Sequence, residues 1–147
     1  MKNILVAINF SDLAPDVLAN SIEIAIALKA KLWLVHVADP NPFFVGYEVE
    51  PPSMRAQRED ELQRERSELE AMARQVQSRG VEAYAELLLG SPISSIIEKA
   101  EEIEADMIII GKEDHGFFYK TFMGSTSEGV VSKAFCPVLV IPLREQE

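Results

Sequence analysis

The residue types best suited to chemistry stand together near the end of the chain. Residues 107–110 form a short apolar run with the β-branched composition of a strand buried on both faces, and Gly111 ends it. Farther on, Gly124-Ser125-Thr126 opens a predicted helix. A strand, a loop and a helix start make an anion site, because free N–H groups and the positive helix end meet there. The hydroxyls of Ser125 and Thr126 can cap the helix or bond phosphate oxygens.

Length and charge narrow the class of protein. The 147 residues predict one domain, residues 1–147, with a substantial core. The net charge of −10 argues against a nucleic-acid binder, which usually has a basic face. No apolar run reaches the roughly 18–20 residues that a membrane span needs, so no membrane insertion is expected.

The cellular compartment of the protein is predicted from its N-terminus and its single cysteine. The N-terminal segment carries a single Lys and soon reaches charged, turn-like residues. A signal peptide has a positively charged start followed by a longer apolar run, so this segment does not resemble one. Cys136 has no partner for an internal disulfide, and its place before Pro137 favours a buried, inert thiol. The sequence therefore predicts a cytoplasmic protein.

Strands and helices alternate along the chain. Alternation of this kind predicts a parallel sheet covered by helices on both faces, with right-handed crossovers. In the helix over residues 54–79, Leu62, Leu69 and Val76 are spaced by seven, which favours one stripe packed on the sheet over a coiled coil. The expected strands cover residues 2–9, 32–37, 81–89, 107–110 and 137–141, and the expected helices cover residues 14–28, 54–79, 93–102 and 124–133.

Three connections are expected to meet at one edge of this sheet. They are the turn after Asn9, the proline-rich loop over residues 39–53, and the loop over residues 111–124. All follow carboxyl ends of strands, where parallel sheets bind ligands. His36 lies inside an apolar strand, and a hydrogen-bonded core histidine is favoured over a metal ligand, since no other His or Cys has ligand spacing.

Four segments, in this order, resemble the universal stress protein family. They are ILVAINFSD, LWLVHV, GSPISSIIEKAEEIEADMIIIG and GSTSEGVVSKAFCPVLVIP. The resemblance covers essentially the whole chain. It implies a Rossmann-like, five-stranded parallel sheet of order 3-2-1-4-5 and a homodimer paired through the last strand, Pro137 to Ile141. Many members of the family bind ATP or another adenine nucleotide, and others bind none.

The family's binding pattern is Gly-x-x-Gly, nine residues, then Gly-Ser or Gly-Thr. Gly111, Gly124 and Ser125 match it, but Asp114 replaces the middle glycine. A side chain at this position leaves less room for the phosphates, and a carboxylate repels their negative charge. A Mg²⁺ ion that bridges Asp114 and the phosphate oxygens would offset the repulsion. Asn9 stands where nucleotide-binding relatives usually have Asp, a milder change because an amide still forms hydrogen bonds.

The resemblance also implies where ATP or AMP would lie. The adenine would lie against the first two strands, the ribose would lie near the ends of the first and fourth strands, and the phosphates would meet N–H groups at the start of the last helix. The residues concerned are Ala7, Ile8 and Val37 for adenine, Asn9 and Ile110 for ribose, and Gly111, Asp114, Gly124, Ser125, Thr126 and Ser127 around the phosphates.

Three classes of function remain open. The first is a dimeric regulator that senses an adenine nucleotide. The second is a stress protein that acts through a protein partner without nucleotide, supported by large apolar residues at Phe117, Phe118, Tyr119, Phe122 and Met123. The third, an enzyme, is least favoured. The chain lacks a Gly-x-x-x-x-Gly-Lys loop and a nucleophile elbow, and the neighbours Glu113, Asp114 and His115 support slow ATP hydrolysis at most.

Overall fold

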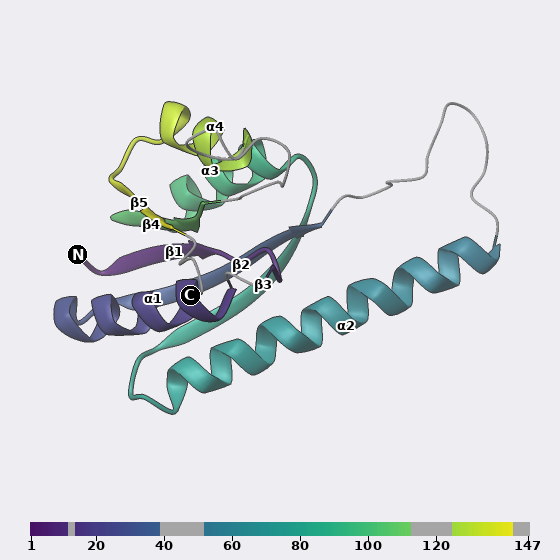
Figure 1. Cartoon of the computed structure of the whole chain (residues 1–147), viewed down its shortest axis with the longest axis horizontal. Helices are drawn as coiled ribbons and strands as arrows, with labels where there is room; N and C mark the ends of the chain where they lie inside the picture. Colours follow the sequence, from purple (N-terminus) through teal and green to yellow (C-terminus); the bar gives the residue numbers. More distant parts are fainter. Residues whose placement is uncertain (12–13, 39–51, 113–124, 143–147) are drawn as a thin grey trace, which may run out of the picture.

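A computed structural model describes residues 1–11, 14–38, 52–112 and 125–142. Strands and helices alternate in the described chain, as the sequence predicts (Figure 1). The elements are β1 Asn3–Ala7, α1 Ala14–Leu28, β2 Lys31–Ala38, α2 Pro52–Gln77, β3 Ala83–Leu89, α3 Pro92–Glu102, β4 Met107–Gly111, α4 Ser125–Lys133 and β5 Val138–Ile141.

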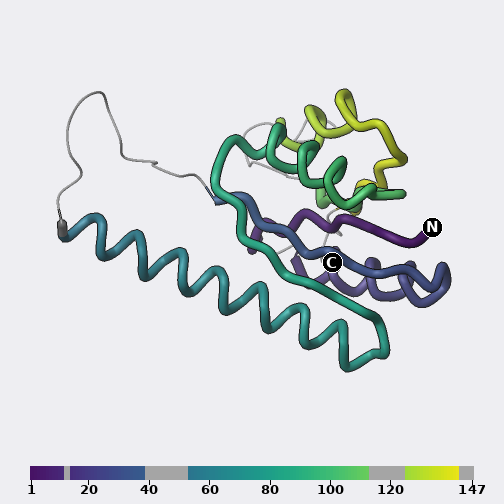
Figure 2. The backbone as a smooth tube through the Cα atoms, turned by 180° about the vertical axis from the view of Figure 1, so that it is seen from behind, coloured from purple at the N-terminus to yellow at the C-terminus, as the bar shows by residue number. Residues whose placement is uncertain are grey.

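The five strands form one parallel sheet in the order β3-β2-β1-β4-β5. The expected fold class and strand order are therefore confirmed. Helices α1 and α2 cover one face of the sheet and α3 and α4 cover the other (Figure 1). The tube in Figure 2 shows the same three layers from behind. Because every strand runs in the same direction, all the carboxyl ends lie at one edge.

Alternate side chains of β1 enter the two halves of the core. Ile4 and Val6 pack in the cluster that contains the buried residues of α1 and α2, whereas Leu5 packs with residues of α3 and α4. All three side chains are fully buried. A strand buried on both faces needs a continuous apolar run, which is the pattern that the sequence shows here.

Helix α2 touches the sheet with only part of its length. Leu69 and Val76 are buried against the sheet, with Ala73 between them, so the predicted single stripe is confirmed for these positions. The other end of α2 extends well beyond the sheet (Figures 1 and 2). No helix in the described part of the chain is long and apolar enough to cross a membrane.

Some predicted boundaries were wrong by one or two residues. The loop predicted over residues 39–53 ends earlier, because α2 begins at Pro52, and proline suits a first helical position. Residues 39–51 lie outside the described part of the chain. Gly111, expected to end its strand, pairs with Ile141 inside the sheet. Strand β1 ends at Ala7, short of the predicted Asn9.

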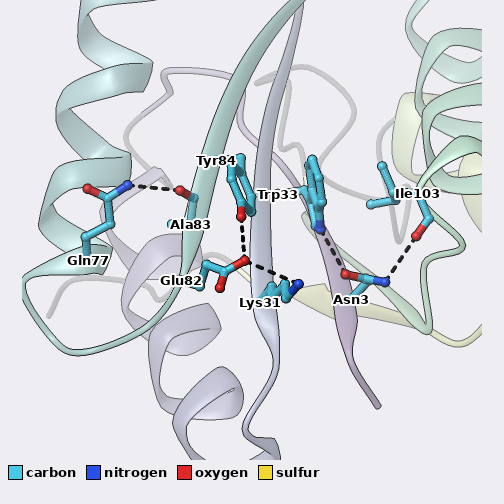
Figure 3. Close-up of polar contacts among 8 residues, drawn as sticks. All are labelled: Asn3, Lys31, Trp33, Gln77, Glu82, Ala83, Tyr84 and Ile103. Carbon is cyan, nitrogen blue, oxygen red and sulfur yellow. Dashed lines mark hydrogen bonds and ion pairs between the residues drawn. The ribbon is translucent and has the colours of Figure 1, made fainter.

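Polar contacts at the opposite, amino-terminal edge tie three segments together (Figure 3). The indole N–H of Trp33 donates to Asn3 Oδ1 at 3.1 Å, and Asn3 Nδ2 donates to the carbonyl of Ile103 at 3.2 Å. The carboxylate of Asp106 accepts the backbone N–H groups of Lys2 at 2.8 Å and Asn3 at 3.0 Å. The start of β1 is thereby fastened to β2 and to the turn before β4.

The Asp106 carboxylate should make stability depend on pH. The N–H groups of Asn3 and then Lys2 hold its pKa below the usual 3.8. Because the folded-state pKa is lowered, this stabilisation is complete above the unfolded pKa and is lost as pH falls through the folded value. We expect Asp106→Asn to lower the unfolding free energy by about 1 kcal/mol at pH 7, and by much less near pH 2.5.

Urea unfolding at the two pH values measures this difference. Glu101→Gln, at an exposed carboxylate on α3, is the matched control and should change little at either pH. If Asp106→Asn lowers the free energy of unfolding equally at both pH values, the contact does not depend on the charge of Asp106.

Candidate functional site

A hollow lies at the carboxyl ends of β1, β2 and β4. With solvent at its mouth included, it encloses about 490 Å³. β1 and β4 are neighbours although two strands separate them in sequence, so the hollow lies where the strand order reverses. It is lined by Ala7, Ile8, Asn9, Val35, His36, Val37, Pro92, Ile96, Ile110, Gly111 and Thr126.

The walls of the hollow are mainly apolar. Ala7 and Val37 belong to the half of the core that packs under α3, and Ile96 of α3 is buried in the same cluster. The backbone N–H of Ile8 donates to the carbonyl of Val35 at 2.8 Å, which continues the β1–β2 ladder up to the rim. An arrangement of this kind accepts a flat apolar group between the sheet and α3. No Lys or Arg side chain lines the hollow among the described residues.

Asn9 is held at the rim by its own turn. Its Oδ1 accepts the Ser11 hydroxyl at 2.7 Å and the Ser11 backbone N–H at 3.3 Å. Phe10, between them, has a φ of 43°, a left-handed conformation that a local side-chain hydrogen bond stabilises. The predicted ribose-contacting side chain is therefore pre-oriented by the chain that follows it.

His36 joins the rim of the hollow to helix α2. Its Nδ1 lies 2.7 Å from the carbonyl oxygen of Ile8, and its Nε2 lies 3.4 Å from Glu65 Oε2. Both ring nitrogens therefore face oxygen atoms. The ring also packs at a tilt against Phe10, with centroids 4.6 Å apart. The prediction of a hydrogen-bonded histidine is confirmed, and no cluster of metal-ligating side chains occurs within the described ranges.

The three hydroxyl residues that open α4 lie in different places. Thr126 lines the hollow, whereas Ser125 is exposed and its side chain is not part of the lining. Ser127 is fully buried, and its hydroxyl donates to the carbonyl of Gly111 at 2.8 Å. This hydroxyl fastens α4 to the end of β4, so Ser127 can meet a ligand only through its backbone. Gly124 and Asp114 lie outside the described residues.

The sequence did not indicate that several of the lining residues belong to the site. Pro92 and Ile96 come from α3, whose apolar stripe predicts core packing and carries no sign of a ligand site. Val35 and His36 belong to an apolar strand that looks the same whether or not it borders a hollow. The residues of α3 and of β2 meet at the hollow only because α3 packs over β2. Cys136 is not in the lining. It is half-buried, not fully buried as predicted, and packs against the core cluster that contains Val130 of α4; this burial raises the pKa of its thiol.

The chain matches the model of the universal stress protein family over residues 1–142. It is 30% identical to universal stress protein MJ0531 of Methanocaldococcus jannaschii over 148 aligned positions, which cover 99% of this chain and 85% of that protein. It is 32% identical to a universal stress protein of Thermus aquaticus, covering 95% of this chain and 98% of the relative.

Solved structures share the fold. Hypothetical protein MJ0577 superposes with a TM-score of 0.83 at 23% identity, covering 99% of this chain and 98% of that one. A universal stress protein from Archaeoglobus fulgidus, solved in complex with dAMP, has a TM-score of 0.64 at 25% identity and 96% and 98% coverage. Another, solved with cAMP, has a TM-score of 0.66 at 18% identity, covering 96% of each chain, which shows the fold alone. By family model, relatives and fold, this chain belongs to the universal stress protein family.

Proposed function

We propose that this protein is a cytoplasmic, dimeric regulator that binds ATP or AMP in the hollow at the carboxyl edge of the sheet. One observation carries the proposal. The hollow at the point where strand order reverses is lined by residues that the family resemblance associates with a nucleotide, namely Ala7, Ile8, Asn9, Val37, Ile110, Gly111 and Thr126. The universal stress protein from Archaeoglobus fulgidus solved with dAMP supports an adenine nucleotide as the ligand class.

The chemistry of the walls suits the three parts of a nucleotide. An adenine ring between Val37 and Ile96 would bury its flat apolar faces. The ribose would then lie near Asn9 and Ile110, where the amide offers hydrogen bonds to hydroxyls. The phosphates would face the first turn of α4, whose N–H groups have no acceptors inside the helix. Gly111, Gly124, Ser125, Thr126 and Ser127 would border them.

The second candidate is a stress protein that binds a protein partner without nucleotide. Asp114, which interrupts the family's glycine pattern, favours it. Asp114 and the aromatic residues between Phe117 and Met123 lie outside the described part of the chain, so this alternative rests on the sequence. The two candidates are separated by whether the purified protein binds nucleotide at all.

Dimerisation through β5 is proposed from the edge of the sheet. Within the described chain, β5 pairs with β4 alone, which leaves its other edge to be covered. Two large apolar side chains in and just after α4, the helix that precedes β5, are exposed: Val131 at 42% and Phe135 at 53%. A second copy of the chain placed along β5 would cover both the strand edge and these side chains.

Nucleotide binding is tested first by calorimetric titration with AMP and with ATP. We expect micromolar affinity, and we expect Asn9→Ala to weaken it about tenfold, the effect of about 1.4 kcal/mol lost with a hydrogen-bonding side chain. Asn20→Ala, on α1 and outside the hollow, is the matched control and should bind as the parent does. A parent protein that gives no heat, and copurifies with no nucleotide, would leave the partner-binding candidate.

Calorimetric titrations of the Asp114→Gly variant test the effect of Asp114, which replaces the middle glycine of the family's binding pattern. If Asp114 repels phosphate, glycine should tighten ATP binding by about 1–2 kcal/mol, with or without Mg²⁺. If Asp114 instead holds Mg²⁺, the same variant should bind ATP more weakly and lose its dependence on Mg²⁺. The same samples, incubated with ATP and Mg²⁺, should release little phosphate, as a regulator requires.

Sedimentation velocity tests the dimer. At micromolar concentration we expect a dimer, and we expect Phe135→Glu with Val131→Glu to give a monomer, because charges would then face the partner's apolar surface. Leu89→Glu changes a side chain exposed by 57% on β3, at the other edge, and should leave the dimer intact. A monomeric parent protein would exclude this interface.

A further inference from the structure

Gly129 allows a very close contact between α4 and α3. A Cβ atom built on Gly129 would lie 2.2 Å from Ile93 Cδ1 and 2.9 Å from Ile93 Cγ1. Gly129 is inside helix α4 and is not among the residues with positive φ, so the helix backbone gives no reason for glycine there. Glycine is in fact a poor residue for a helix interior. The close approach of Ile93 supplies the reason.

This contact lies beside the proposed nucleotide site. On α3, Ile93 stands between Pro92 and Ile96, and both of these line the hollow. On α4, Thr126 lies three residues before Gly129, so the two share a face of the helix, and Thr126 also lines the hollow. The contact therefore sets the distance between the two helices where they border the ligand.

A second attachment holds the first turn of α4. The buried Ser127 hydroxyl donates to the Gly111 carbonyl at 2.8 Å, which fixes that turn to the end of β4. Ser127 controls the position of α4 relative to the sheet, and Gly129 controls it relative to α3. Together they decide where the N–H groups of the first turn point.

We infer that Gly129 is a positioning residue that holds the first turn of α4 against the hollow and thereby determines the affinity for the phosphate of a bound nucleotide. The inference rests on the proposed function. A methyl group at residue 129 cannot be accommodated by turning the end of Ile93 alone, since Cγ1 is also too close. Either Ile93 changes its χ1 rotamer, which a β-branched side chain in a helix resists, or α4 moves. We expect α4 to shift, and its N–H groups to shift with it.

Adenosine and AMP are the probes, because they differ only in the phosphate. For Gly129→Ala we expect AMP to bind about tenfold more weakly, the upper range for an anion at a helix start. Adenosine affinity should stay unchanged. Ile93→Ala combined with Gly129→Ala removes the clash and should restore AMP binding. Ser132→Ala, at an exposed position of the same helix, is the control for alanine's helix preference and should change neither affinity.

The outcomes separate this inference from the proposed function. A parent protein that binds neither probe overturns both. AMP binding that is unchanged in Gly129→Ala, or that falls no more than adenosine binding does, overturns the positioning role alone. Should Gly129→Ala fail to fold, Ser127→Ala tests the same first turn: a selective loss of AMP affinity supports the inference, and parallel loss of both probes overturns it.

Discussion

Burial of β1 on both faces is the constraint on which the rest of the structure depends. Ile4, Leu5 and Val6 are fully enclosed, and they can be so only if helices cover the sheet on both sides. Such a strand must also have a partner at each edge, which β2 and β4 provide. The reversal of strand order at β1 and β4 follows, and it opens the hollow at their carboxyl ends.

Polar side chains in this protein mostly fasten one element to another at the ends of the apolar layers. At one edge, Asp106 and Asn3 secure the start of β1. At the other edge, His36 bonds the Ile8 carbonyl and reaches Glu65 of α2. Ser127 bonds the end of β4. Each bond satisfies a group that a purely apolar core would leave without a partner.

The hollow therefore has apolar walls and a polar rim. Its walls come from the sheet and α3, and its rim comes from the turn at Asn9 and the first turn of α4. This division matches a ligand with a flat apolar part and an anionic part. Neighbouring residues of α4 have different roles. Thr126 lines the hollow, whereas Ser127 and Gly129 hold the helix against β4 and α3.

The sequence by itself determined the alternation of strands and helices, because buried strands and one-sided helices differ in their apolar periodicity. It indicated that the ends of β1 and β4 and the start of α4 border a site, and its resemblance to a family implied the strand order. Only the tertiary structure brought Pro92 and Ile96 to the hollow, and only it turned the Ser127 hydroxyl toward Gly111. It also decided why residue 129 is glycine, since that depends on Ile93 of another helix. Periodicity records which face of an element is buried, whereas contacts between elements distant in sequence depend on how those faces pack together.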